Sequence, residues 1–241
     1  MAVIPYCGPA PAPSAVFSAW NFDPLLIAAL LLAHVLPRAH PPRVQIGMAM
    51  LWLAFVSPLC ALSAGLFSAR SVHHLLIVFA AAPLLAGVLP RSLRLPPLWA
   101  ITLAHVAVFW AWHVPAAYGW ALSSDAAYWA GQVALLGSAM AFWAVLTRPA
   151  TSALMGFLAL LAMVMQMGLL GALITFAPRA LYAPHFLTTG QYGLSPLEDQ
   201  QLAGLLMWVG SLPLTAAAGW AVLRRLMPAA PASPPVGQAA A

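Results

Sequence analysis

Histidine has the clearest potential for chemistry in this sequence, and four of its seven copies lie at the ends of apolar segments. His73 and His74 begin one segment, His113 ends another, and His185 follows a third. Imidazole is a frequent ligand of copper and zinc, and a thiolate such as that of Cys7 adds a preference for Cu(I). These five side chains are candidate metal ligands, although no H-x-x-x-H or C-x-x-C spacing supports a site by itself.

Each of these histidines also has an ordinary structural interpretation. A single histidine near a membrane interface is commonly an amphipathic residue or a hydrogen-bonded helix end. His105 lies eight residues before His113, about 12 Å deeper along a helix. Met163 and Met167 are expected to pack against neighbouring helices, because thioethers are common fillers of helix interfaces.

His73 and His74 are neighbours, and two adjacent residues on a helix point about 100° apart. They cannot both face one bound partner, so one of them faces a site and the other faces elsewhere. Ser71 is suited to cap a helix that begins beside them. The positive end of the helix dipole would then disfavour imidazolium, so both rings are expected to be neutral and free to act as ligands.

The four acids are mostly explained by helix capping. Asp23 precedes a proline, as an N-cap does. Asp125 follows two serines and is expected to be another cap, and the run SPLE at 195–198 fits a capping box. Asp199 has no such partner in the local sequence, so it remains a candidate ligand.

The composition decides the class of protein. Of the 241 residues, 63% are hydrophobic and 5% are charged, and the mean hydropathy is +0.92. A soluble domain carries about 25% charged residues, so this chain is an integral membrane protein. The pI near 9.9 reflects scarce acids and scattered arginines rather than a basic patch, and no nucleic-acid partner is expected.

We predict an all-α bundle of about seven transmembrane spans, at 23–36, 46–66, 72–89, 97–114, 126–146, 152–176 and 200–226. Seven arginines then lie on one side of the bilayer: Arg38, Arg43, Arg91, Arg94, Arg148, Arg224 and Arg225. Only Arg70 and Arg179 lie on the other. The positive-inside rule places the N-terminus outside and the C-terminus inside. Residues 1–227 form one transmembrane domain, and the Pro- and Ala-rich stretch 228–241 is predicted to be a disordered cytoplasmic tail.

Several runs of residues resemble one known family, the CtaG family of caa3-type cytochrome c oxidase assembly factors, of the multi-pass membrane type. They are LSPLEDQQLAGLLMW at 194–208, WHVPAAY at 112–118, HLLIVFAAAPLLAGVLP at 74–90, PYCGPAP at 5–11 and WNFDP at 20–24. The resemblance covers nearly the whole chain. It departs from the family where many relatives have a histidine four residues before His74, because this sequence has Arg70 there.

The resemblance implies a role in maturing a haem–copper oxidase in the bacterial inner membrane, by delivering or inserting copper. It implies contacts with oxidase subunits and with a periplasmic copper chaperone. His74 and His113, with His73, Cys7 or Asp199 nearby, are then the expected copper ligands on the periplasmic side. The other residues that match family motifs or lie near this site are Tyr118, Gln200, Met207, Trp208, His185 and His105.

Two other functions remain open at this stage, and an enzyme is not expected because no nucleophile–base pattern occurs. A copper or small-solute transporter would need a polar path across the bilayer, and the inner half offers few polar residues. A b-type haem protein would need two embedded histidines at one depth, whereas His34 and His105 are expected to differ in depth.

Overall fold

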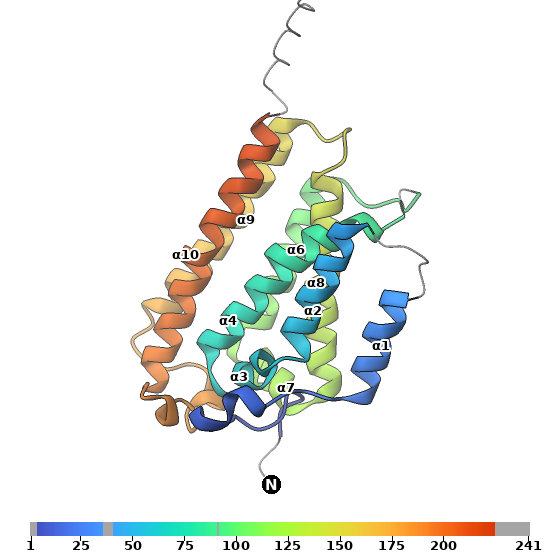
Figure 1. Ribbon diagram of the computed structural model, residues 1–241. Helices are drawn as coiled ribbons and strands as arrows, with labels where there is room; N and C mark the ends of the chain where they lie inside the picture. Colours follow the sequence, from blue (N-terminus) through green and yellow to red (C-terminus); the bar gives the residue numbers. More distant parts are fainter. Residues whose placement is uncertain (1–3, 36–40, 91, 225–241) are drawn as a thin grey trace, which may run out of the picture.

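The computed structural model describes residues 4–35, 41–90 and 92–224, and all regular structure in these ranges is helical. Figure 1 shows the long helices side by side as a bundle, with α1 set apart at one edge. The α-helices and their bounds are α1 Pro24–Val35, α2 Pro42–Phe55, α3 Pro58–Gly65, α4 Phe67–Leu75, α5 Ala82–Leu85, α6 Leu98–His113, α7 Pro115–Ser123, α8 Asp125–Leu146, α9 Ala153–Thr175 and α10 Pro196–Leu223.

The membrane-crossing capacity of these helices is less uniform than seven equal spans. Four continuous helical stretches are long and apolar enough to cross a bilayer: Phe67–Val88, Asp125–Leu146, Ala153–Thr175 and Pro196–Leu223. The pairs α2–α3 and α6–α7 bend by 46° and 74°, and counting each pair as one span brings the total to six. The helix α1 is apolar but shorter. The chain is therefore an all-helical membrane protein with four to six candidate spans among the described residues.

Short helical segments gather at one end of the bundle, beside the N-terminal arm (residues 4–12) (Figure 1). The helix α3 contacts the 3₁₀ helices η1 (Pro13–Ser18) and η4 (Ala183–His185), and η4 also contacts α7. The segment between α9 and α10 contributes η4 and a further 3₁₀ helix, η5 (Thr189–Tyr192). We call this end, where α3, α7 and the 176–195 segment meet, the arm end.

The expected caps are present at two of the three acids. Asp23 accepts from the amides of Leu25 and Leu26 at 2.8 and 2.9 Å, and Ser195 with Glu198 forms the predicted capping box of α10. The prediction for Asp125 was wrong by one residue. Ser124 is the N-cap of α8, and Asp125 is the first helical residue.

The helix that carries the histidine pair begins earlier than predicted. It starts at Phe67, so Ser71 is not its cap, and His73 and His74 lie in its second turn rather than its first. It continues beyond Leu75 through a π-helical segment, η2 (Leu76–Ala81), into α5 and a 3₁₀ turn, η3 (Ala86–Val88). The dipole argument for neutral rings loses its basis, because the rings no longer lie at the helix end.

Small residues bring α9 and α10 into close contact. A Cβ on Gly171 would lie 2.8 Å from the carbonyl oxygen of Gly204, and a Cβ on Gly204 would lie 2.5 Å from that of Gly171. Helices in lipid gain little from hydrophobic association with each other, so close backbone approach and van der Waals packing join them instead.

The predicted tail at 228–241 and the topology residues Arg38, Arg91 and Arg225 lie outside the described residues.

Candidate functional site

A small cavity inside the bundle is lined by both His74 and His113. Its volume is about 30 Å³, room for about two water molecules or one ion. Helices α4, α6, α7 and α8 all contribute to its wall. The lining residues are Arg70, His74, Trp112, His113, Tyr118, Ala121, Leu122, Tyr128, Gly131, Gln132 and Leu135.

The two histidine rings of the cavity lie at right angles, with 5.6 Å between their centroids and 80° between their planes. His113 Nδ1 donates to the carbonyl oxygen of Phe109 at 2.7 Å. Because a carbonyl can only accept, the neutral ring carries its proton on Nδ1, and its Nε2 keeps a free lone pair. His74 Nδ1 is buried and has no hydrogen-bond partner. Both rings therefore have a nitrogen that is free for a ligand.

The neighbour His73 points away from this cavity. It is fully buried, and its ring packs edge-on against Phe55 of α2 at 5.1 Å between centroids. The centroids of the His73 and His74 rings are 5.7 Å apart. The 100° separation of adjacent helical residues thus sends one imidazole to the cavity and the other to the α2–α4 interface.

The segment between α9 and α10 packs against two residues of the cavity wall at the arm end. His185 Nε2 shares a hydrogen bond of 2.6 Å with the hydroxyl of Tyr118, which lines the cavity. The hydroxyl of Tyr182 donates to the backbone oxygen of His113 at 2.8 Å. Phe67 packs against both Tyr118 and Tyr182, with ring centroids 5.1 and 4.0 Å away, and the two tyrosine rings also contact each other. His185 therefore lies beside the site, bonded to the lining residue Tyr118, but is not part of the lining itself.

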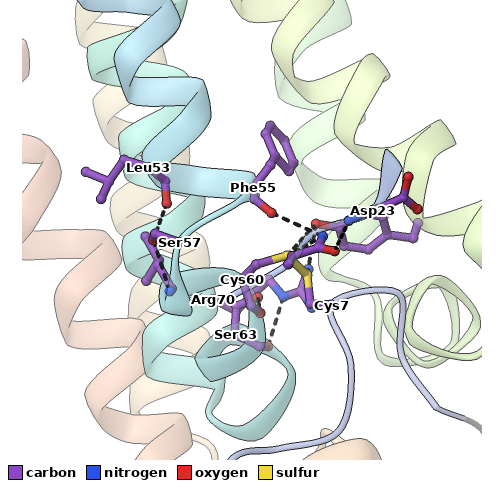
Figure 2. Close-up of a disulfide and its surroundings, with 11 residues drawn as sticks. Cys7, Asp23, Leu53, Phe55, Ser57, Cys60, Ser63 and Arg70 are labelled. Atoms are coloured by element: carbon purple, nitrogen blue, oxygen red, sulfur yellow. Dashed lines mark hydrogen bonds between the residues drawn. A yellow bond between two sulfur atoms is a disulfide. The ribbon is translucent and has the colours of Figure 1, made fainter. Parts of the chain in front are cut away.

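Cys7 is joined to Cys60 in a disulfide, so in this state it offers no thiolate to a metal (Figure 2). Neither sulfur reaches the cavity, but the hydroxyl of Tyr128 lies 3.4 Å from Cys7 Sγ and 3.9 Å from Cys60 Sγ. Tyr128 therefore contacts the disulfide and also lines the histidine cavity. In the described parts of the chain, no three His, Cys, Asp or Glu side chains come together as a metal site.

Comparison with known proteins identifies the family. The sequence model of the cytochrome c oxidase caa3 assembly factors (Caa3_CtaG) matches residues 44–229. The chain belongs to this family. The match includes His74, His113 and the segment around Asp199, whereas the N-terminal arm with Cys7 precedes it. No curated protein and no solved structure matches the chain.

Asp199, which lies in the matched region, has a structural position that the local sequence conceals. Its carboxylate accepts from the amides of Phe67 and Ser68 at 2.6 and 3.1 Å, and from the hydroxyl of Ser68. It thereby caps α4 from α10, across a sequence separation of 132 residues. The residue is fully buried and its oxygens are occupied, so the expectation that Asp199 is a free ligand beside the histidines is not met.

The other expected residues from the family motifs hold helices together. Gln200 accepts from the Leu181 amide at 2.6 Å and donates to the backbone oxygens of Ile174 and Arg179. Met207 is buried in the apolar core, and Trp208 packs over Gly171. His105 Nδ1 is hydrogen-bonded to the hydroxyl of Ser138 at 2.8 Å, away from the histidine pair. In this assembly factor, Gln200 and Trp208 stabilise the α9–α10 hairpin.

Three polar residues of the cavity were not among the expected site residues: Arg70, Tyr128 and Gln132. Arg70 had a signal, because it lies one helical turn before His74. Tyr128 and Gln132 lie on one face of α8, four residues apart, which is the spacing of neighbours on a helix. Nothing in their own sequence indicates which helix that face contacts.

The segment beside the cavity is expected to loosen in acid, because burial and, to a smaller extent, the Arg70 guanidinium together lower the pKa of His185 to about 4. When the segment is unfolded, the His185 imidazole has a pKa near 6.5 and binds the proton more readily than in the folded protein. Neutral His185 therefore makes its full contribution to the stability of the segment above pH 6.5. As the pH falls towards 4, the free energy of unfolding the segment decreases by about 3 kcal/mol.

Hydrogen exchange of residues 180–194 at pH 7 and pH 5 measures this loss. We expect faster exchange at pH 5 in the wild type. His185→Gln, which keeps a hydrogen-bonding group for Tyr118 and does not titrate, should show much less pH dependence. An equal acceleration in both proteins would mean that another group controls the segment.

Proposed function

We propose that this protein assists the assembly of a caa3-type cytochrome c oxidase in the bacterial inner membrane by holding copper transiently between His74 and His113. The observation that carries the proposal is the pair of neighbouring imidazoles, 5.6 Å apart between ring centroids, in the wall of a small internal cavity. Each ring has a nitrogen free for coordination. Copper is cargo in this proposal, and the protein acts as a binding protein with no chemical reaction of its own.

The small ligand number supports transfer rather than storage. Imidazole nitrogens suit copper, and two ligands are enough for Cu(I), which accepts linear coordination. The described residues provide no third His, Cys, Asp or Glu to complete a tighter site. A two-ligand ion leaves positions open for an incoming ligand from an oxidase subunit or from a periplasmic copper chaperone, and that is the route by which we propose the ion exchanges.

The proposed periplasmic position of the site rests on two independent arguments. The excess of arginines at the opposite end of the bundle favours a cytoplasmic location there. The disulfide lies at the same end of the bundle as the cavity's cover, and disulfides persist in oxidising compartments such as the periplasm. Copper would then be received and released at the arm end, by movement of the 176–195 segment.

Copper binding by the purified protein tests this function directly. We expect about one Cu(I) per wild-type chain in competition with a chromogenic Cu(I) chelator. His74→Ala and His113→Ala should each lower the affinity at least tenfold, since one imidazole cannot hold the ion alone. His73→Ala is the matched control, because its ring lies next to His74 but faces α2, and it should bind as the wild type does.

The cellular counterpart is oxidase maturation in a strain that carries each variant. His74→Ala and His113→Ala should reduce the copper content of the resident oxidase. The haem spectrum of the same oxidase should show whether haem insertion is intact and only copper is lost. Normal copper content and activity in both strains would contradict the proposal, and so would Cu(I) binding that the two substitutions leave unchanged.

A further inference from the structure

Arg70 is a buried cation in the wall of the histidine cavity. Its side chain is 3% exposed. The Nε donates to the backbone oxygen of Ser63 at 3.2 Å, and Cζ lies 5.5 Å from the centre of the Tyr128 ring. Of the two terminal nitrogens, Nη2 is buried without a hydrogen-bond partner. Figure 2 shows the side chain between Ser63 and the disulfide. Because guanidinium stays protonated in proteins, this positive charge is permanent.

No carboxylate balances this charge at the cavity. The lining contains no Asp or Glu. The buried acid Asp199 lies at the start of the helix that carries Arg70, but its oxygens are bonded to Phe67 and Ser68. There it offsets the positive end of the α4 dipole. An ion that enters the cavity therefore meets the guanidinium in the wall itself, whereas the Asp199 carboxylate keeps its charge at the start of α4, outside the lining.

We infer that Arg70 makes the His74–His113 site selective for a soft monovalent cation and excludes divalent ions. This inference rests on the proposed function and specifies its cargo as Cu(I), as opposed to Zn²⁺ or Cu²⁺. Coulomb repulsion is proportional to the charge of the entering ion, and it is strong in a dry, low-dielectric interior. Imidazole alone does not discriminate in this way, because it binds zinc and both oxidation states of copper.

The charge also explains why a cation site would tolerate an arginine. A divalent ion beside a buried guanidinium adds two further positive charges to the interior, which is costly without an anionic partner in the cavity wall. A monovalent ion adds half of that repulsion. Two neutral imidazoles can compensate the smaller charge by donating electron density, and they retain the ion only weakly, as transfer requires.

Metal-binding affinities of charge variants test the inference. Arg70→Gln removes the charge and keeps hydrogen-bonding groups, while Arg70→Lys keeps the charge and is the matched control. We expect Arg70→Gln to tighten both Cu(I) and Zn²⁺, with the logarithm of the Zn²⁺ gain about twice that of the Cu(I) gain. The Zn²⁺-to-Cu(I) affinity ratio should rise at least tenfold in Arg70→Gln and stay within about threefold of wild type in Arg70→Lys.

Gln132→Glu offers a second route to the same result if Arg70→Gln does not fold. Gln132 lines the cavity, and its Oε1 has no hydrogen-bond partner. The isosteric carboxylate would neutralise Arg70 with little change of shape, so Zn²⁺ binding should again gain more than Cu(I) binding. In each variant, adding His74→Ala checks that the gained metal is bound by the histidine pair.

The outcomes separate this inference from the proposed function. Cu(I) binding with an unchanged metal ratio in Arg70→Gln and Gln132→Glu would overturn the inference alone. So would wild-type protein that binds Zn²⁺ at the histidine pair as tightly as it binds Cu(I). Wild-type protein that binds neither metal at the pair would overturn both.

Discussion

Replacing Asp199 by alanine should lower the free energy of unfolding by about 2–4 kcal/mol. The carboxylate holds two amides and one hydroxyl at the start of α4. Its removal leaves those donors buried without partners, and each orphaned group costs free energy in an interior that water cannot reach. Because α4 carries both Arg70 and His74, loss of its first turn should also weaken Cu(I) binding.

Thermal unfolding of the detergent-solubilised protein measures the first effect. Asp199→Asn keeps one acceptor oxygen and the shape, so it should lose about half as much stability. Glu198→Ala is the control next in sequence, since Glu198 closes an exposed capping box and its loss should cost much less stability than the loss of Asp199. Equal destabilisation by Asp199→Ala and Glu198→Ala would show that the contact between α10 and α4 contributes little.

The helical class and the positions of most apolar segments could be predicted from composition and breakers, but the breaks within the segments could not. The predicted span 46–66 contains Pro58, where the helix bends by 46°. The residues after Pro115 were assigned to a connection, yet they form α7. In both places the sequence is apolar on every side, so its periodicity carries no information about the bend. Ser57 as N-cap and Pro58 in the first turn are a local signal for a new helix.

The candidate site could be predicted in part, because one of its features is local and the others are not. The division between His73 and His74 follows from helix geometry alone, and the family motif around His74 indicates which ring faces inward. The partner of Asp199 is 132 residues away, and Arg70 approaches Tyr128 from another helix. Such contacts depend on the order in which helices pack, and a single sequence of uniformly apolar helices does not specify that order.

The pairing of Cys7 with Cys60 illustrates the same limit, since two cysteines 53 residues apart predict no bond by their spacing. The structure gives the bond a position with consequences. Tyr6, next to Cys7, stacks on Tyr128 with 4.9 Å between ring centroids. Tyr128 in turn lies against both sulfurs and against the cavity. The disulfide therefore holds the N-terminal arm on the wall of the histidine site.

Reducing this disulfide should lower the stability by up to about 4 kcal/mol, the chain-entropy value for a loop of this length. The loss should be nearer 2 kcal/mol if the reduced chain remains restricted by the bilayer. Thermal unfolding with and without a phosphine reductant measures it, and the double variant Cys7→Ser/Cys60→Ser should match the reduced wild type and ignore the reductant. Mass spectrometry must confirm that the wild-type bond is open before the comparison is made.

The same samples show whether the N-terminal arm only stabilises the protein or also restricts access to the histidine site. If the arm only adds stability, reduction should leave the rate of Cu(I) uptake at His74 and His113 unchanged. If the arm restricts access past Tyr128, uptake should become faster when the bond opens, and Tyr6→Ala should reproduce that acceleration with the disulfide intact. The second result is expected, because Tyr6 and the two sulfurs all contact Tyr128, which lies between the arm and the cavity. A stability loss without any change in uptake would assign the arm a purely structural role.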